Sequence, residues 1–187
     1  MGAEQTRCLA ARAADRGTVR FRDATPDDVA AIAGLHNAAA GALTARHGPG
    51  PWSALATERG TMLALRHARI RHARIRVGRD GKRIVTVLRL ATKKPWAIDV
   101  SYFTPVKRPL YPTGMVVSVA HQGQGLGRLA LEDAVAVAQR WPADAIRLDA
   151  FDADAGPGRF YIRCGFTERG MVVYKSDLLV YLERLLL

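Results

Sequence analysis

A glycine-rich stretch within residues 115–128 carries the clearest chemical signal in this sequence. An apolar run is followed by Gly123, Gly125 and Gly127 at alternate positions, and a helical pattern begins there. Such a turn presents successive backbone N–H groups at the positive end of a helix dipole, which favours an anion such as phosphate. Glycine also lets a ligand approach the backbone because it has no Cβ. The alternative interpretation is a plain strand-to-helix connection.

Two familiar phosphate-binding motifs do not fit this spacing. The dinucleotide motif needs G-x-G-x-x-G, and Gly127 comes one residue too early for it. The P-loop ends in Gly-Lys-Ser/Thr, whereas Arg128 follows the last glycine here. The pattern that fits is Q/R-x-x-G-x-G/A, met by Gln122, Gly125 and Gly127. It resembles the acetyl-CoA pyrophosphate loop of the GNAT superfamily, the acetyl-CoA-dependent N-acyltransferases.

A second stretch resembles the other GNAT signature, N-x-x-A-x-x-F/L-Y-x-K-x-G-F. Asp154 stands where the family usually has Asn, Pro157 where it usually has Ala, and Arg163 where it has Lys. The Asn commonly helps to hold the pantetheine arm, and an Asp there accepts but does not donate a hydrogen bond. The residues that match the signature are Phe160, Tyr161, Gly165 and Phe166.

The resemblance implies an α/β fold, a GNAT-like acyl-CoA N-acyltransferase fold. It consists of a twisted mixed sheet of about seven strands with about four helices and splayed central strands. We expect a single domain over residues 18–187 and a disordered or loosely attached tail over residues 1–17. The local patterns predict strands at 19–22, 73–77, 145–151, 168–175 and 178–186, a helix opening at Thr25-Pro26, a hairpin at Asp80-Gly81 and a helix over 126–141.

The same resemblance implies how acetyl-CoA would bind. Pantetheine would lie between the fourth and fifth strands, against the backbone of Val117, Ser118 and Val119. The pyrophosphate would meet the N–H groups of the loop, which are those of Gln122, Gly123, Gln124, Gly125, Leu126, Gly127 and Arg128. Asp154, Phe160 and Tyr161 complete the expected cofactor-binding set. Tyr161 stands at the family's general-acid position and would protonate the leaving thiolate.

The acceptor side is less defined by the sequence. Residues 93–105 are aromatic and bounded by prolines, and Asp99 is a lone carboxylate among apolar neighbours. Asp99 can accept the proton of an amine or bind it, or it can be a structural residue bonded within its own loop. Asp149 and a water chain are the other candidates for the base. We assign Trp96, Asp99 and Asp149 to substrate binding, and Asp99 together with Tyr161 to catalysis.

Composition limits the class of ligand. The net charge of +11 favours an anionic ligand such as acetyl-CoA, permits nucleic acid and argues against polycationic acceptors. A duplicated pentapeptide over residues 66–76 is basic, and we interpret its second copy as a solvated strand face rather than a nucleic-acid patch. His67 and His72 have no carboxylate or cysteine nearby in the sequence that could complete a metal site, so we expect no metal. Cys8 and Cys164 lie far apart in the sequence and are not expected to form a disulfide, and no apolar run is long enough to span a membrane. We therefore expect a cytoplasmic protein. The composition, rich in Ala and Arg, is typical of a bacterial protein.

These observations predict an N-acetyltransferase that moves an acetyl group from acetyl-CoA to a primary amine by direct attack in a ternary complex. The alternative is a non-catalytic module that senses acyl-CoA or binds RNA or the ribosome, for which the departures at Asp154 and Pro157 leave room. The prediction allows a monomer or a homodimer, and the acceptor can be a small amine, an amino acid, or the N-terminus or a lysine of a protein.

Overall fold

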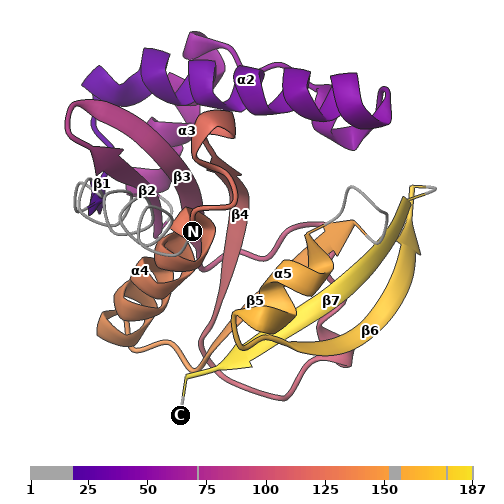
Figure 1. Cartoon of the computed structure of the whole chain (residues 1–187). Coiled ribbons are helices and arrows are strands. Elements are labelled where there is room, and N and C mark those ends of the chain that lie inside the picture. Colours follow the sequence, from indigo (N-terminus) through magenta and orange to yellow (C-terminus); the bar gives the residue numbers. More distant parts are fainter. Residues whose placement is uncertain (1–18, 71, 152–156, 176, 187) are drawn as a thin grey trace, which may run out of the picture.

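A seven-stranded mixed sheet organises the protein, with strand order β1-β2-β3-β4-β5-β7-β6 (Figure 1). The computed structural model describes residues 19–70, 72–151, 157–175 and 177–186. The strands are β1 (Arg20–Asp23), β2 (Ala73–Asp80), β3 (Arg83–Ala91), β4 (Pro109–Val117), β5 (Ala145–Phe151), β6 (Thr167–Tyr174) and β7 (Asp177–Leu185). The α-helices of this part of the chain are α2 (Val29–His47), α3 (Glu58–Ile70), α4 (Leu126–Arg140) and α5 (Gly158–Arg163).

Helices cover the two faces of the sheet separately. On one face, which we call the α2 face, apolar residues of β2 and β3 such as Val77 and Val87 pack against α2 and α3. On the opposite face, the α4 face, Leu110, Ile146 and Leu182 pack in one cluster with residues of α4 and α5. Figure 1 shows α5 lying across β5 and β7. The sheet therefore separates two hydrophobic cores.

The loop between β3 and β4 covers the α2 face of the C-terminal strands. It contains a short 3₁₀ turn, η3 (Val100–Tyr102), and buries Ile98 and Phe103 against Tyr111 and Tyr181. Buried Glu183 of β7 anchors it, because its carboxylate accepts a hydrogen bond from the Thr104 N–H at 3.3 Å. The same carboxylate pairs with Arg147 of β5 at 2.9 Å. Loop and strands are thus held together by one buried ionic network.

The two central strands separate after a short stretch of pairing. β4 and β5 run parallel and pair at Pro109↔Ala145 and Leu110↔Ile146 only. Beyond Leu110 the strands diverge, as Figure 1 shows, and the edge of β4 that faces β5 is left without a strand partner. The splayed central strands that the sequence predicts are present.

A β-bulge lies in the diverging part of β4. Val87 pairs with Val116 but Arg89 pairs with Thr113, so β4 contains one more residue than β3 across this interval. Gly114 provides the positive φ of +60° at this position, which is unfavourable for residues with a Cβ. The bulge reverses the alternation of side chains along β4. Thr113 and Val116 consequently both belong to the α2 face.

The structure confirms most of the predicted elements. Asp80 pairs with Arg83 across a tight hairpin in which Gly81 has a φ of +54°. The predicted helix over 126–141 ends one residue earlier, at Arg140. The helix predicted at Thr25-Pro26 begins as a 3₁₀ turn, η1 (Pro26–Asp28), and continues as α2. The expected tail at residues 1–17 lies outside the described residues.

The duplicated pentapeptide gives the main surprise of the fold. Its first copy completes α3, which the sequence analysis did not predict, while its second copy enters β2. The basic strand residues are ion-paired: Arg76 contacts Asp133 of α4 at 2.7 Å and Asp23 of β1 at 2.8 Å. The prediction of a solvated strand face is wrong for Arg76, whose side chain is largely buried between its two carboxylate partners and is not part of an open nucleic-acid patch.

Candidate active site

The glycine loop forms a turn directly between β4 and α4. After β4 the chain makes a 3₁₀ turn, η4 (Val119–His121), and Gly123 and Gly125 then adopt φ values of +75° and +84°. Gly125 is the N-cap residue of α4 in the left-handed region, and its C=O accepts the first helical hydrogen bond, from the N–H of Leu129 at 3.2 Å. These conformations favour glycine and turn the backbone into the helix.

The loop leaves its backbone donors available for an anion. Among the described residues, the N–H groups from Gly123 to Arg128 have no hydrogen-bond acceptor. The N–H of Gln122 differs, because it donates to the Val119 C=O at 3.3 Å. The available run therefore starts one residue later than the sequence analysis expected. The Arg128 side chain is exposed beside it and pairs with Glu132 at 3.1 Å.

Gly127 allows the loop to pack against the second signature. A Cβ at this position would lie 3.0 Å from Cζ of Phe160 and 3.3 Å from Cε of Met115. A side chain at residue 127 would therefore crowd the first turn of α4 against α5 and β4. Phe160 in turn stacks edge-on against Tyr161, with ring centroids 5.2 Å apart. The two sequence motifs are in direct contact.

The Tyr161 side chain bridges the splayed strands. It extends from α5, and its hydroxyl lies 3.9 Å from Sδ of Met115 on the diverging part of β4. Burial, together with the negative charge of Asp149, raises the pKa of Tyr161 to about 12. The hydroxyl is therefore protonated at neutral pH, and a thioether sulfur is only a weak acceptor for that proton. This is the state that a general acid needs.

Asp149 lies on β5, beyond the last residue that pairs with β4. It is opposite Tyr181 in the β5–β7 register and therefore on the α2 face of the sheet. Its side chain is half-buried, and burial raises the pKa of its carboxyl. A raised pKa is the direction that suits a carboxylate base for an amine.

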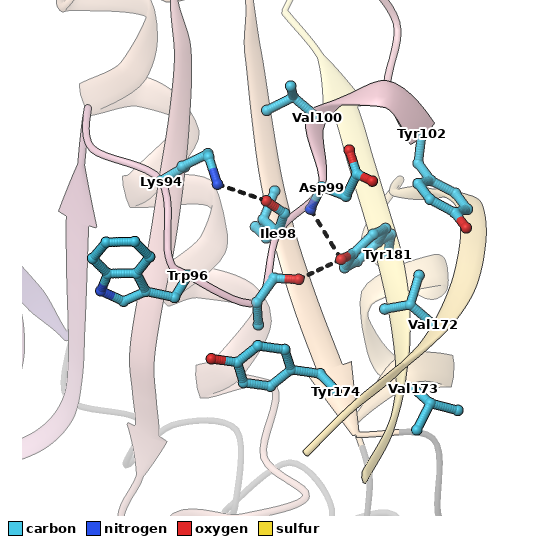
Figure 2. A pocket seen from close by; sticks show the side chains of 11 residues that line it. Lys94, Trp96, Ile98, Asp99, Val100, Tyr102, Val172, Val173, Tyr174 and Tyr181 are labelled. Atoms are coloured by element: carbon cyan, nitrogen blue, oxygen red, sulfur yellow. Dashed lines mark hydrogen bonds between the residues drawn. The ribbon is translucent and has the colours of Figure 1, made fainter. Parts of the chain in front are cut away.

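Trp96 and Asp99 lie elsewhere, in an open pocket of about 590 Å³ between the β3–β4 loop and strands β6 and β7. Figure 2 shows both of them with Tyr174 and Tyr181 around this pocket. The Tyr181 hydroxyl accepts a hydrogen bond from the Asp99 N–H at 3.0 Å and donates one to the Ala97 C=O. Asp149 does not line this pocket, so the structure does not bring the three predicted acceptor residues into one site.

The Asp99 carboxylate acts as a local cap. Its Oδ1 accepts hydrogen bonds from the N–H and hydroxyl of Ser101, at 2.9 and 2.8 Å. These bonds, the one from the backbone first, lower the pKa of Asp99. A lowered pKa makes a carboxylate a poorer base. The geometry thus favours the structural alternative for Asp99 that the sequence left open.

The sequence model of the Acetyltransferase (GNAT) family matches residues 68–166. The chain belongs to the GNAT acetyltransferase family. Its class as an acyltransferase enzyme, predicted from the two motifs, is confirmed.

Solved GNAT structures share the fold at low sequence identity. yncA of Salmonella typhimurium, solved with acetyl-CoA, is 18% identical with a TM-score of 0.68, over 90% of this chain and 94% of that one. A ribosomal-protein-alanine N-acetyltransferase of Brucella melitensis is 15% identical with a TM-score of 0.69, over 89% and 99%. A spermidine N-acetyltransferase chimera from Vibrio cholerae is 18% identical with a TM-score of 0.66, over 90% and 95%. No curated protein matches the sequence.

Two residues near the splayed strands were missed as site candidates. His36 of α2 reads in sequence as one more residue of an apolar helical face, and Arg89 of β3 reads as one arginine of an alternating strand. Both are half-buried on the α2 face beside β4, and only the folded arrangement brings them there. Asp154 was predicted to contact the cofactor and lies outside the residues that the structure describes.

Cys164 and the helices complete the account of this part of the chain. Cys164 is buried, and burial raises the pKa of its thiol, which makes it a poor nucleophile. In the described residues, no helix combines the length and apolar character that a membrane span needs.

Proposed function

We propose that this chain transfers the acetyl group of acetyl-CoA to a primary amine by direct attack in a ternary complex. The observation that carries the proposal is the run of unbonded N–H groups from Gly123 to Arg128, placed directly beside the opening between β4 and β5. The run fits a pyrophosphate, and the unpaired edge of β4 fits the amides of a pantetheine arm.

The loop and strand residues give the cofactor its position. We assign the backbone of Val117 and Val119 and the N–H groups from Gly123 to Arg128 to cofactor binding, with Phe160 and Tyr161 beside them. Ser118, which the sequence analysis included, is left out because its N–H donates to the Val85 C=O and its C=O accepts from the His121 N–H, both at 2.8 Å. Bound acetyl-CoA supplies the activated thioester. Fixing the two reactants in the correct geometry is the main source of rate acceleration in such a reaction.

Tyr161 and Asp149 divide the proton transfers between them. Asp149 takes the proton that the amine must lose, directly or through water, and Tyr161 gives a proton to the departing sulfur. Their opposite roles agree with their surroundings, because Tyr161 is held protonated while the carboxylate of Asp149 has a raised pKa. We place Asp149 rather than Asp99 at the amine, since Asp99 already accepts two hydrogen bonds from Ser101.

The alternative of an RNA- or ribosome-binding module finds less support. Arg76 of the basic strand is engaged by Asp133 and Asp23, so it is not available to phosphates. A bacterial cytoplasm, where acetyl-CoA is made and thiols stay reduced, is the compartment that the proposal implies.

Thiol release from acetyl-CoA, measured against a panel of small amines, amino acids and polyamines, tests the proposal. We expect release that depends on a primary amine, with the N-acetylated product identified by mass spectrometry. Absence of amine-dependent release, combined with RNA binding that weakens steeply with salt, would favour the binding module.

A further inference from the structure

Arg89 is a half-buried guanidinium without a partner in the described part of the protein. It lies on β3 opposite Ile75, a residue of the core beneath α2 and α3, which places it on the α2 face. It forms no ion pair or hydrogen bond with a described residue, and burial lowers its pKa. By contrast, half-buried Arg76 and buried Arg147 each contact a carboxylate. A half-buried cation without an anion is unfavourable, and a bound anion would relieve the cost.

The register of the sheet aligns Arg89 with Asp149. Arg89 pairs with Thr113 of β4, and Leu110 pairs with Ile146 of β5. Three residues farther along both strands, Thr113 and Asp149 stand at the same level on either side of the opening. Arg89, Thr113 and Asp149 therefore form a row across the α2 face, with the cation on one side of the splayed strands and the carboxylate on the other.

Gly114, next to Thr113 in this row, presents no side chain toward α2. This residue is exposed, and a Cβ on it would lie 3.7 Å from Cε1 of His36, which descends from α2. Burial lowers the pKa of His36, so its imidazole is neutral at pH 7 and adds no second positive charge beside Arg89. The aromatic contact between Trp52 and Phe151, with centroids 6.4 Å apart, borders the same face at the end of β5.

We propose that the acceptor is a small amino-carboxylate, such as an amino acid, whose carboxylate binds Arg89 and whose amine faces Asp149. Neighbouring strands lie about 4.8 Å apart, so the Cα atoms of Arg89 and Asp149 are at least about 10 Å apart. Across this span, the guanidinium of Arg89 binds the carboxylate of one small zwitterion and the carboxylate of Asp149 binds its ammonium group. The net charge of +11 disfavours a polycationic acceptor such as a polyamine, and a zwitterion has no net charge to oppose it. The inference rests on the proposed function for the identity of the reacting amine.

Binding of the reaction product separates this inference from catalysis. N-acetyl-L-leucine and N-acetyl-L-phenylalanine keep the carboxylate but carry no ammonium group, so their affinity depends on Arg89 and not on Asp149. We expect calorimetry on the CoA-loaded protein to show binding that Arg89→Met weakens by about tenfold to a hundredfold. Arg83→Met, on the exposed end of β3, removes the same charge and should leave the affinity unchanged. CoA affinity should be equal in all three proteins.

Turnover provides the second measurement. L-leucine and L-phenylalanine are compared with isopentylamine and 2-phenylethylamine, which lack only the carboxylate. We expect wild-type kcat/KM to favour the amino acids, and Arg89→Met to remove that preference while sparing the amines. The carboxylate assignment would be overturned if the wild type preferred the amines, or if Arg89→Met lowered kcat/KM equally for amino acids and amines. Either result would leave the acetyltransferase activity itself intact. If the protein shows no turnover but still binds the product in a way that depends on Arg89, only the proposed function is overturned. If the wild type does not bind the product, the inference is overturned.

Discussion

Replacement of Gly125 by leucine tests the phosphate loop most directly. Gly125 has a φ of +84°, and no heavy atom of the described residues lies within 4 Å of the place where its Cβ would be. Leucine would therefore meet no protein atom, but it would enter the open space in front of the free N–H groups. The left-handed conformation costs a residue with a Cβ about 1–2 kcal/mol. For a domain of this size, that lowers Tm by about 2–8 °C.

Gly81→Leu is the matched control for this substitution. Gly81 also has a positive φ, +54°, and open space around its Cβ position, but it lies in the β2–β3 hairpin, away from the glycine loop. Both variants should show a similar loss of Tm without ligand. Any difference between them in the presence of acetyl-CoA then reports on the loop and not on strain.

The assay is thermal unfolding with and without acetyl-CoA. At a concentration of 100 times Kd, a ligand stabilises the folded state by about 2.7 kcal/mol. That corresponds to an increase in Tm of about 5–11 °C for a protein of this length. We expect wild type and Gly81→Leu to show the full increase and Gly125→Leu to show almost none. A full increase in Gly125→Leu would refute the assignment of the pyrophosphate to this loop.

Three further predictions concern the residues around the opening. Tyr161→Phe should lower kcat by about 10²–10⁴-fold with little change in KM for acetyl-CoA, and steady-state kinetics with an unchanged kcat would exclude Tyr161 as the acid. Gly127→Ala should lower the free energy of unfolding in urea by about 1–3 kcal/mol, because its Cβ would lie 3.0 Å from the Phe160 ring. The control is Gly34→Ala, which lies in open space on α2 and should raise the free energy of unfolding by up to about 1 kcal/mol. Equal effects of the two substitutions would contradict the packing argument. Asp149 has a raised pKa in the folded protein, so ionising it opposes folding, and the contribution of Asp149 to stability falls as pH rises from below its unfolded pKa through its folded one. Asp149→Asn should therefore match the wild type in acid and exceed it at neutral pH, and chemical unfolding across pH that shows the reverse trend would contradict this.

The geometry of the glycine loop, to which we assign the cofactor, could be predicted from the sequence because its determinants are local. A turn with glycines at alternate positions followed by a helix needs no distant residue to expose its N–H groups. Phe160 and Tyr161 fall in one short motif in the same way. The packing of Phe160 against Gly127 was not readable, since it joins residues that only the fold brings together.

The proposed acceptor site could not be predicted from the sequence because its residues come from three strands and a helix. Arg89 and Asp149 are 60 residues apart in sequence and align only through the strand register. Asp99 attracted attention as a lone carboxylate, but its partner Ser101 is two residues away and fixes it in a turn. Local pattern reveals such a cap only when the turn itself can be predicted.

The pentapeptide duplication shows how far tertiary packing overrides local sequence. Residues 66–70 and 71–75 are identical, yet the first set is helical and the second enters a strand. Ala68 and Ala73 occupy equivalent places in the two copies and are both buried in the core beneath α2 and α3. His72, at the junction, takes a positive φ of +48°. The conformation of each copy is set by what it packs against.

The bulge at Gly114 lies in the part of β4 that has separated from β5. Upstream of it Tyr111 and Thr113 lie on the α2 face, and downstream of it Met115 faces Tyr161. Deleting Gly114 would restore the regular alternation of β4 opposite β3, so Met115 and Val116 would keep their present faces. The deletion would instead remove the bend that an extra residue introduces into a strand. The extra residue therefore affects the course of β4 past the opening and not the choice of side chains on each face.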